Sequence, residues 1–308
     1  MLKLTWLLTC KSFTIMHYQI IYNPTAGRGK ARAALPLLEY QLKKTDQKYV
    51  IHEFDTPDTI SERLADIEKA DVLVALGGDG TINLLIPFLL EHENPLGIIP
   101  AGMINNLARA AGVARKVPEA VKTLIAGQTK CVDVGCINDT VYFINGMGVG
   151  FDGQVNLEGN DIQSITGQKV HIVAIARALR NYQPTQVQIE MNDKVFEASV
   201  FQLAIGNSPY MGGGFKLTPE ALMDDGVLDV AMVEPLRKGR IVRNIRKLRN
   251  GKVSVLNEIH LDRTKQLTFT SAATMPVHYD GEVFQPMEKQ VSVKVIPAAV
   301  KLIGDWQY

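Results

Sequence analysis

An aspartate set among three glycines, directly after a short apolar run, is the pattern in this chain that most suggests chemistry. The run Val72–Leu76 carries no charge, which predicts a strand buried on both faces of a parallel sheet. The following Gly77–Gly80 lets backbone amides approach an anion, and Thr81 begins a helix whose positive end favours phosphate. Asp79 would meet that phosphate through Mg²⁺ or an ordered water, because a bare carboxylate repels it. The pattern predicts a phosphate-handling turn, with an ordinary glycine-rich turn as the alternative.

Two further runs follow predicted strands and reach the same edge of the sheet. Asn23–Ala31 reads NPTAGRGKA and opens a helix, and Pro100–Arg109 reads PAGMINNLAR. The first run lacks the spacing of a P-loop and of the GxGxxG fingerprint, which disfavours a dinucleotide-binding dehydrogenase. Arg28 and Lys30 could supply positive charge to nucleotide phosphates, or they could be solvated side chains of a turn.

The elements that position these runs alternate between strand and helix as far as about residue 127. The pattern predicts strands at 17–23, 48–54, 72–76 and 96–99, and helices near 30–45, 59–69, 81–92, 104–111 and 117–127. Short strands then follow at 130–137, 140–144, 186–191, 195–204, 227–233, 267–270 and 291–295, with helices near 165–181 and 238–249. We therefore predict an α/β plus β fold, in which an N-terminal parallel α/β, Rossmann-like nucleotide domain precedes a C-terminal antiparallel β-sandwich. The active site is expected in the cleft between them.

The predicted domain boundaries follow the change of rhythm. Residues 1–15 precede Met16 and the first strand, and their apolar run is too short to span a bilayer, so they are expected to form a weakly ordered extension. Residues 16–129 form the predicted nucleotide-binding domain and 130–296 the β-sandwich domain. Residues 297–308 could return to the first domain.

Bulk composition excludes several classes of protein. Lys and Arg number 33 against 32 Asp and Glu, for a net charge of +1, so no global charge points to nucleic acid. The three cysteines lack paired C-x-x-C spacing, which disfavours a disulfide framework and a zinc site and fits a reducing cytoplasm.

With these motifs together, the chain resembles the diacylglycerol kinase catalytic family, which includes bacterial soluble lipid kinases and the sphingosine and ceramide kinases. The resemblance extends from Tyr18 to the C terminus. It is supported in the second half by NGMGVGFD at 145–152, GNSPYMGGG at 206–214, DDGVLDV at 224–230 and YDGE at 279–282.

The resemblance implies ATP-dependent transfer of the γ-phosphoryl group to a lipid hydroxyl, with diacylglycerol as the default acceptor and Mg²⁺ as cofactor. In the family the Asp-Gly-Glu segment supplies the base, and we assign that role to Glu282, with Asp280 as its partner or a Mg²⁺ contact. Alternate residues on an extended segment share a face, so both carboxylates could point into one site. Two solvated carboxylates in a hairpin turn are the alternative. Asp79 would link the γ-phosphate, Mg²⁺ and the acceptor hydroxyl.

The resemblance also implies the residues that bind the nucleotide and a structural metal ion. The predicted nucleotide-binding residues are Asn23, Pro24, Thr25, Gly27, Arg28, Lys30, Gly77, Gly78, Asp79, Gly80, Thr81, Asn83, Gly102, Met103, Asn105 and Asn106. The predicted Mg²⁺ site takes the Asp225 carboxylate and the carbonyls of Leu222 and Val227, with a plain Asp-Gly turn as the alternative. Met103 departs from the Thr or Ser that family members typically carry, and Asn106 from the usual Asp. Met103 offers no hydroxyl to a nucleotide, which leaves weaker nucleotide affinity open.

A basic amphipathic segment, Arg237–Lys252, could dock the protein on a membrane. It holds eight basic residues and no acid, and its apolar residues recur at helical spacing. We predict that Arg240, Arg243, Arg246 and Lys247 contact an anionic membrane, so that the protein is cytoplasmic and peripherally membrane-associated. A solvated helix that packs on the β-domain is an equal alternative.

Two other functions are compatible with the sequence. NAD kinase shares a GGDG turn after a buried strand, although the NPTAGRGKA opening, the asparagine-containing third run and the terminal DGE favour a lipid kinase. A catalytically weak lipid- or nucleotide-binding regulator is suggested by Met103, although the retained Asp79, Asp280 and Glu282 argue against it. No nucleic-acid partner is expected, and an edge strand of the β-domain could form a homodimer.

Overall fold

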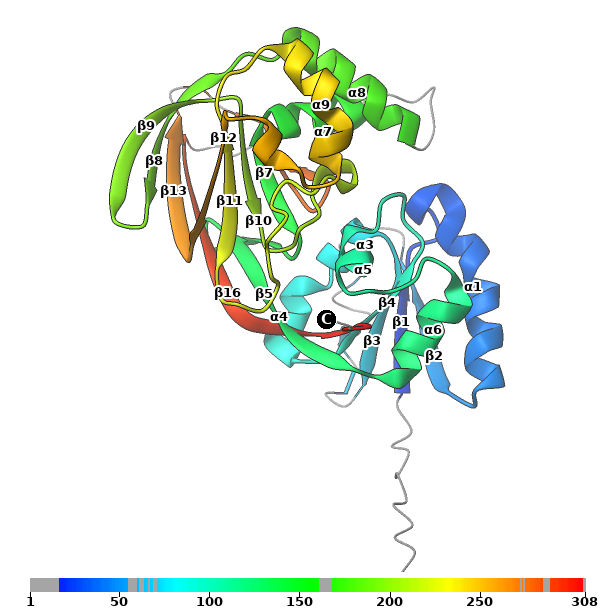
Figure 1. Ribbon diagram of the computed structural model, residues 1–308. Helices are drawn as coiled ribbons and strands as arrows, with labels where there is room; N and C mark the ends of the chain where they lie inside the picture. Colours follow the sequence, from blue (N-terminus) through cyan, green and yellow to red (C-terminus); the bar gives the residue numbers. More distant parts are fainter. Residues whose placement is uncertain are drawn as a thin grey trace, which may run out of the picture.

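The N-terminal half is a parallel sheet covered by helices. The computed structural model describes residues 17–54, 60, 64–65, 67–68, 71–160, 168–271, 273, 275–284 and 289–306. The strands of this half are β1 (His17–Tyr22), β2 (Lys48–Glu53), β3 (Val72–Gly77) and β4 (Leu96–Pro100), in the order β2-β1-β3-β4. Its helices are α1 (Ala26–Lys44), α3 (Asp79–Asn83), α4 (Ile86–His92), α5 (Asn106–Ala110) and α6 (Val117–Ala126) (Figure 1).

The buried strands explain why this half folds as a layered sheet. Every residue of β3 and of β4 is buried, as expected for uncharged strands with helices on their faces. Helices α1 and α6 contact each other, and they pack on β3 and β4 respectively. The parallel register brings the carboxyl ends of β1, β3 and β4 to one edge, and the three glycine-containing runs follow these ends.

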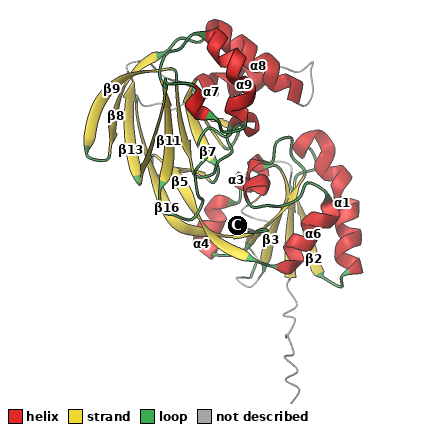
Figure 2. Ribbon diagram, viewed as in Figure 1, coloured by secondary structure: helices red, strands yellow, loops and turns green. Residues whose placement is uncertain are grey.

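The C-terminal half consists of two packed antiparallel sheets (Figure 2). Its strands are β5 (Thr129–Ile137), β6 (Val141–Phe143), β7 (Gly146–Gly150), β8 (Thr185–Met191), β9 (Lys194–Val200), β10 (Gln202–Gly206), β11 (Leu228–Val233), β12 (Ile259–Thr264), β13 (Gln266–Ser271), β14 (Val277–Tyr279), β15 (Glu282–Phe284) and β16 (Gln290–Ile303). One sheet runs β12-β11-β10-β7-β14-β15, and a shared apolar core joins it to β5, β8, β13 and β16. Helices α7 (Phe151–Asn160), α8 (Gln168–Asn181) and α9 (Lys238–Arg249) lie together at the end of this half in both views.

Strand β16 joins the two halves. It pairs antiparallel with β13 and β5, and near its end Leu302 pairs in parallel with Leu96 of β4. Its register shifts between Ile296 and Val300, where Ala298 has a φ of 49°. This bulge bends the strand as it passes from one half to the other. The order β2-β1-β3-β4-β16-β13-β8-β9 is therefore one continuous sheet path.

The predicted fold class is confirmed, and two predicted elements prove to be split. The helix expected at 81–92 is α3 and α4, because Pro87 lies in the first turn of α4 and cannot continue a preceding helix. The strand expected at 195–204 is β9 and β10, because the chain changes sheets at Phe201. The predicted 1–15 extension and most of the predicted 59–69 helix lie outside the described residues. Among the described helices, none has the length and apolar content needed to cross a bilayer.

Candidate active site

Backbone contacts between glycines bring the three glycine-containing runs together. A Cβ added at Gly102 would lie 2.4 Å from the Cα of Gly78, and one at Gly27 would lie 2.0 Å from the carbonyl oxygen of Ala101. The backbone N–H groups of Ala101 and Gly102 both donate to the Gly77 carbonyl. These distances leave no room for side chains. The structure thus places the runs after β1, β3 and β4 against one another.

The first run folds into a tight loop before the regular part of α1. The Asn23 carboxamide oxygen accepts the Thr25 N–H at 2.8 Å and the Thr25 hydroxyl at 2.7 Å. Gly27, Arg28 and Gly29 then follow with φ values of 61°, 61° and 84°. Three successive left-handed residues require the flanking glycines. The regular helix therefore begins near Lys30, as the sequence predicts.

Asp79 anchors α5. Its two carboxylate oxygens accept the backbone N–H groups of Asn106 and Leu107, each at 3.0 Å, and the Asn145 carboxamide lies 3.5 Å from one of them. Burial raises the pKa of Asp79 to about 6, although the two backbone N–H groups oppose that rise. These contacts fix the run Pro100–Arg109 relative to the turn Gly77–Gly80.

We predict a pH dependence from Asp79. An ionised carboxylate accepts both N–H groups of α5 more strongly than the protonated acid does, so turnover should rise with pH through a midpoint near 6, the raised pKa. The measurement is kcat/KM between pH 5 and 8 at constant ionic strength. Asp79→Asn should abolish the acid limb of this profile together with most of the activity, and an acid limb retained in Asp79→Asn would contradict the assignment.

Asp280 is a structural anchor of the β14–β15 turn. Asp280 and Gly281 have φ values of 47° and 95° and form a two-residue hairpin turn. The buried Asp280 carboxylate accepts the N–H groups of Ile144, Asn145 and Gly146 at 2.8–3.2 Å, and also the Asn83 carboxamide at 3.1 Å. Burial raises the pKa of Asp280, and these donors oppose that rise. Asn83 thereby joins α3 to the C-terminal half, with a second bond to the Tyr142 carbonyl.

Glu282 instead faces the glycine-rich turn of the other half. A Cβ added at Gly80 would lie 2.7 Å from a carboxylate oxygen of Glu282, so this approach depends on Gly80 having no side chain. Because Asp280 and Gly281 form the turn, the two carboxylates occupy different surroundings: Asp280 is buried among N–H donors, and Glu282 is exposed beside the turn that carries Asp79.

The third run is held by Asn105 and leaves Met103 at the surface. Asn105 accepts the Gly102 N–H at 2.9 Å and donates to the Gly102 carbonyl at 3.1 Å. The Met103 side chain is 45% exposed, and Arg115 binds the Met103 and Ile104 carbonyls. Asn106 is buried, and its side-chain oxygen has no hydrogen-bond partner among the residues that the structure describes.

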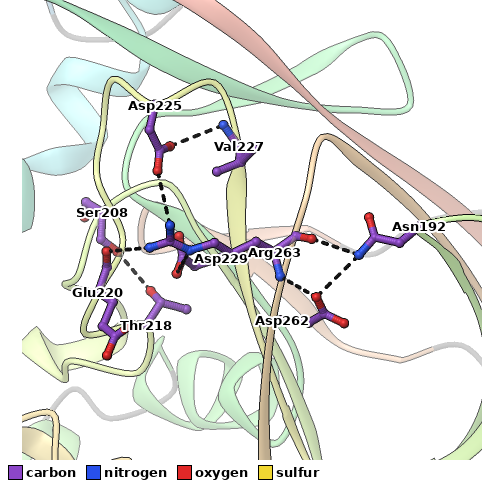
Figure 3. A network of polar contacts seen from close by, with 9 residues as sticks. All are labelled: Asn192, Ser208, Thr218, Glu220, Asp225, Val227, Asp229, Asp262 and Arg263. Atoms are coloured by element: carbon purple, nitrogen blue, oxygen red, sulfur yellow. Dashed lines mark hydrogen bonds and ion pairs between the residues drawn. The ribbon is translucent and has the colours of Figure 1, made fainter.

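The Arg263 guanidinium lies beside Asp225, the predicted metal ligand (Figure 3). One oxygen of Asp225 accepts the Val227 N–H at 3.3 Å, and the other lies 3.7 Å from the Arg263 guanidinium. Arg263 also contacts Asp229 at 3.2 Å and the Glu220 carbonyl at 3.1 Å. Within the described part of the chain, no group of three or more His, Cys, Asp or Glu side chains could hold a metal ion. The Asp225 charge is thus already offset by a guanidinium.

Sequence reasoning missed Asp133, which fixes the turn before β11. Its carboxylate accepts the Gly226 N–H and the Ala298 N–H, each at 2.7 Å. The partners lie 93 and 165 residues away in the chain. The only signal in the sequence is that a carboxylate interrupts an otherwise apolar part of a predicted strand. Burial raises the pKa of Asp133, and the two N–H donors oppose that rise.

An apolar pocket lies between the end of the β-sandwich and its helices. Its wall includes Phe151 and Val155 of α7, Ile175 of α8, and Ile241 and Ile245 of α9. The pocket holds about 760 Å³ of empty space, part of it open solvent. These residues come from three separate helices, and α9 lies far along the chain from the other two, which is why no single sequence pattern revealed the pocket.

A buried ion pair forms the polar edge of this pocket. Asp152 lines the pocket and lies 2.6 Å from the His278 ring nitrogen Nε2. Burial alone would lower the pKa of His278, but the Asp152 carboxylate outweighs it and raises that pKa. A Cβ added at Gly212 would lie 2.6 Å from the Asp152 carboxylate, so the loop at 212–214 adjoins the polar edge. The same loop faces α5, because a Cβ at Gly214 would lie within 4 Å of Asn106 and Arg109.

Comparison with known proteins agrees with this geometry. The family model of the diacylglycerol kinase catalytic domain matches residues 17–137. The model of the YegS C-terminal NAD kinase beta sandwich-like domain matches residues 145–304, which is more than half of the chain. The chain belongs to the diacylglycerol kinase family. It is therefore a kinase, an enzyme that phosphorylates an alcohol acceptor with ATP.

Relatives and solved structures match most of this chain. The chain is 29% identical over 276 residues to a diacylglycerol kinase of Staphylococcus saprophyticus, and the match covers 86% of this chain and 88% of that protein. It is 28% identical over 272 residues to one of Bacillus subtilis, covering 86% and 89%. A solved diacylglycerol kinase of Bacillus anthracis superposes with a TM-score of 0.67 at 22% identity, covering 95% and 97% of the two chains. The likeness to that structure shows the fold.

Proposed function

We propose that this family member transfers the γ-phosphoryl group of ATP to the free hydroxyl of diacylglycerol, giving phosphatidic acid. The observation that carries the proposal is the apolar pocket whose polar edge adjoins the loop at 212–214, which in turn faces α5. The pocket suits acyl chains, and its polar edge lies between them and the glycine-containing runs. The diacylglycerol kinase names of the relatives support the same acceptor.

In the proposed mechanism, Glu282 takes the proton of the acceptor hydroxyl. The lipid oxygen then bonds to the γ-phosphorus, and the bond from that phosphorus to the bridging oxygen breaks to release ADP. Glu282 suits this role because its carboxylate is exposed and faces Gly80, whereas Asp280 is occupied by four donors. The assembled runs would hold the nucleotide through backbone N–H groups. Their fixed positions limit reorganisation during transfer.

The proposal includes Mg²⁺ as the ion that accompanies ATP. Asp79 has two oxygens whose remaining lone pairs could face a cation, so it fits a Mg²⁺ ion that accompanies ATP. Such an ion would offset phosphate charge. The second predicted ion, at Asp225, has a poorer donor set because Arg263 already neutralises that carboxylate. The Asp225 site stays a prediction, and we propose no step that depends on it.

A direct assay tests the function. Purified protein with radiolabelled ATP and Mg²⁺ should phosphorylate diacylglycerol in mixed micelles, with NAD and other lipid alcohols as parallel acceptors. Product with NAD alone would refute the proposal and favour the NAD kinase alternative, which the name of the C-terminal family model makes worth testing. Absence of product with every acceptor would favour a binding regulator.

We further propose that α9 docks the protein on anionic membrane. Its inner residues Ile241, Ile245 and Leu248 line the apolar pocket, so the helix is fixed at the place where a lipid would enter. Arg243, Arg246 and Lys247 are exposed on its outer side, next to Val242, which is 59% exposed. Arg240 is paired with Glu258 and is the least available of the four predicted contacts.

Docking through α9 predicts that the protein binds anionic vesicles less well when basic residues of this helix are neutralised. Replacing Arg243, Arg246 and Lys247 together by glutamine should reduce sedimentation with anionic vesicles about tenfold or more, since each basic group near such a surface contributes about 1 kcal/mol. Activity in detergent micelles should be retained. The matched control replaces Lys43, Lys44 and Lys48 by glutamine. These residues are exposed at the end of α1 and the start of β2, in the other half of the chain. Unchanged sedimentation of the α9 variant would refute the docking surface. The predicted homodimer would be tested separately by sedimentation equilibrium.

A further inference from the structure

Two cations from different halves of the chain share one aromatic ring. The Arg109 guanidinium of α5 lies 4.1 Å from the centre of the Tyr210 ring, and the Lys216 ammonium lies 5.0 Å from it. Tyr210 and Lys216 belong to the loop after β10, in the C-terminal half. The ring attracts both cations, but the two positive charges repel each other. Among the described ion pairs, neither cation has a carboxylate partner.

An unpartnered polar atom lies on the same helix as Arg109. Asn106 is only 7% exposed, and its side-chain oxygen has no hydrogen-bond partner in the described structure. A Cβ at Gly214 would lie 3.7 Å from a terminal guanidinium nitrogen of Arg109 and 3.9 Å from this oxygen. Gly214 has a φ of 82°, which other residues rarely adopt. Gly214 thus lies next to both the Arg109 guanidinium and the unpartnered oxygen of Asn106.

The helix that carries Arg109 and Asn106 adjoins Asp79, one of the residues predicted to bind the nucleotide. The Asn106 backbone N–H donates to Asp79, and Arg109 lies one turn further along the same helix. The facing loop is the one whose Gly212 contacts Asp152 at the polar edge of the apolar pocket. A group held here would lie between the nucleotide side and the lipid side. Asn106 adds no negative charge beside Arg109, and Lys216 lies on the same Tyr210 ring as Arg109.

We propose that Arg109 and Lys216, held by Tyr210, form a clamp for a phosphate monoester across the junction of the two halves. The clamp rests on the proposed function. It would take either the terminal phosphate of the nucleotide or the phosphate of the lipid product, since both present the same chemistry. An anion offsets the repulsion between the cations, and a guanidinium and an ammonium both bind phosphate oxygens well. The uncharged oxygen of Asn106 can accept the hydroxyl hydrogen of an acceptor or of a monoprotonated phosphate.

Calorimetry with purified full-length variants tests the clamp without relying on turnover. Lys216→Gln and Arg109→Gln are each expected to weaken binding of a phosphate monoester about tenfold or more, because each removes charge-assisted hydrogen bonds. One arm measures ATP against ADP, and a selective loss for ATP assigns the clamp to the nucleotide phosphate. The second arm measures dioctanoyl phosphatidate against dioctanoylglycerol in micelles, and a selective loss for phosphatidate assigns it to the lipid phosphate.

Conservative variants separate clamping from folding. Tyr210→Leu should weaken the same ligand as the cation variants, and Tyr210→Phe should restore its binding because the ring is retained. Lys122→Gln, on the exposed face of α6, is the matched control, and thermal unfolding verifies that each variant is folded. ATP/ADP and phosphatidate/diacylglycerol ratios within twofold of the wild type in both cation variants would overturn the clamp. Absence of lipid phosphorylation by the wild type, with an ATP loss in the variants, would refute the proposed acceptor and leave the clamp standing.

Discussion

Replacing Glu282 by glutamine is expected to lower kcat by about 10²–10⁴-fold, the usual contribution of a positioned general base. Glutamine keeps the size of the side chain and its approach to Gly80, but it cannot take the proton of the acceptor hydroxyl. The side chain is exposed, so the free energy of unfolding should change by less than about 0.5 kcal/mol. The measurement combines steady-state kinetics with ATP binding and thermal unfolding.

The control for Glu282 is another exposed glutamate far from the junction. Glu119→Gln, in the first turn of α6, should keep its full rate. A Glu282→Gln enzyme that keeps more than a tenth of the wild-type kcat at saturating ATP and lipid would contradict the assignment of the base. Loss of ATP affinity in place of kcat would instead indicate a role in nucleotide binding.

Asp280→Asn is expected to cause the largest loss of stability, about 3 kcal/mol in the free energy of unfolding. The change replaces one acceptor oxygen by an NH₂ group among the N–H donors of Ile144, Asn145, Gly146 and the Asn83 side chain. Donors then face donors in a buried position. At roughly 2–4 °C per kcal/mol for a protein of this size, Tm should fall by about 6–12 °C. Thermal unfolding by circular dichroism measures it.

The matched control for Asp280 is Asp46→Asn. Asp46 also has a positive φ, 52°, but it is exposed in the turn between α1 and β2. Asparagine tolerates that backbone conformation, so the control isolates the effect of the buried hydrogen bonds. Equal shifts in Tm for the two variants would show that the Asp280 contacts contribute nothing beyond the turn. Kinetics on folded Asp280→Asn would show whether the turn also positions Glu282.

Local patterns in the sequence determined the layers of the fold and the location of the glycine-containing runs. Uncharged runs such as Val72–Leu76 can only be buried, and the strand–helix alternation limits their arrangement to a parallel sheet. The glycines could also be predicted, because Gly27, Gly78 and Gly102 lie where no side chain fits. Sterics of this kind act over a few residues and leave a signature in the residue types.

Periodicity failed at two places where an element ends within a continuous pattern. The 81–92 pattern is continuous as a helix, yet Pro87 lies in the first turn of a new helix that begins at Ile86. The 195–204 pattern is continuous as a strand, yet Phe201 donates its N–H to Val233 and the chain changes sheets there. Strand β7, with three glycines in five residues, has only Met147 and Val149 as apolar side chains, and its pairing with β10 and β14 defines it as a strand.

Only the tertiary structure distinguishes the surroundings of side chains of the same type. Asp280 and Glu282 read alike in the sequence, but Asp280 is buried and accepts four hydrogen bonds from residues far away in the chain, whereas Glu282 is exposed. Asp225 is a predicted metal ligand by sequence, and only the fold shows that Arg263 lies beside it. Tyr210 reads as a loop residue until Arg109 is found on its ring. The sequence determines which residues are available, whereas the partners of a carboxylate or a cation depend on chain segments that only folding brings together.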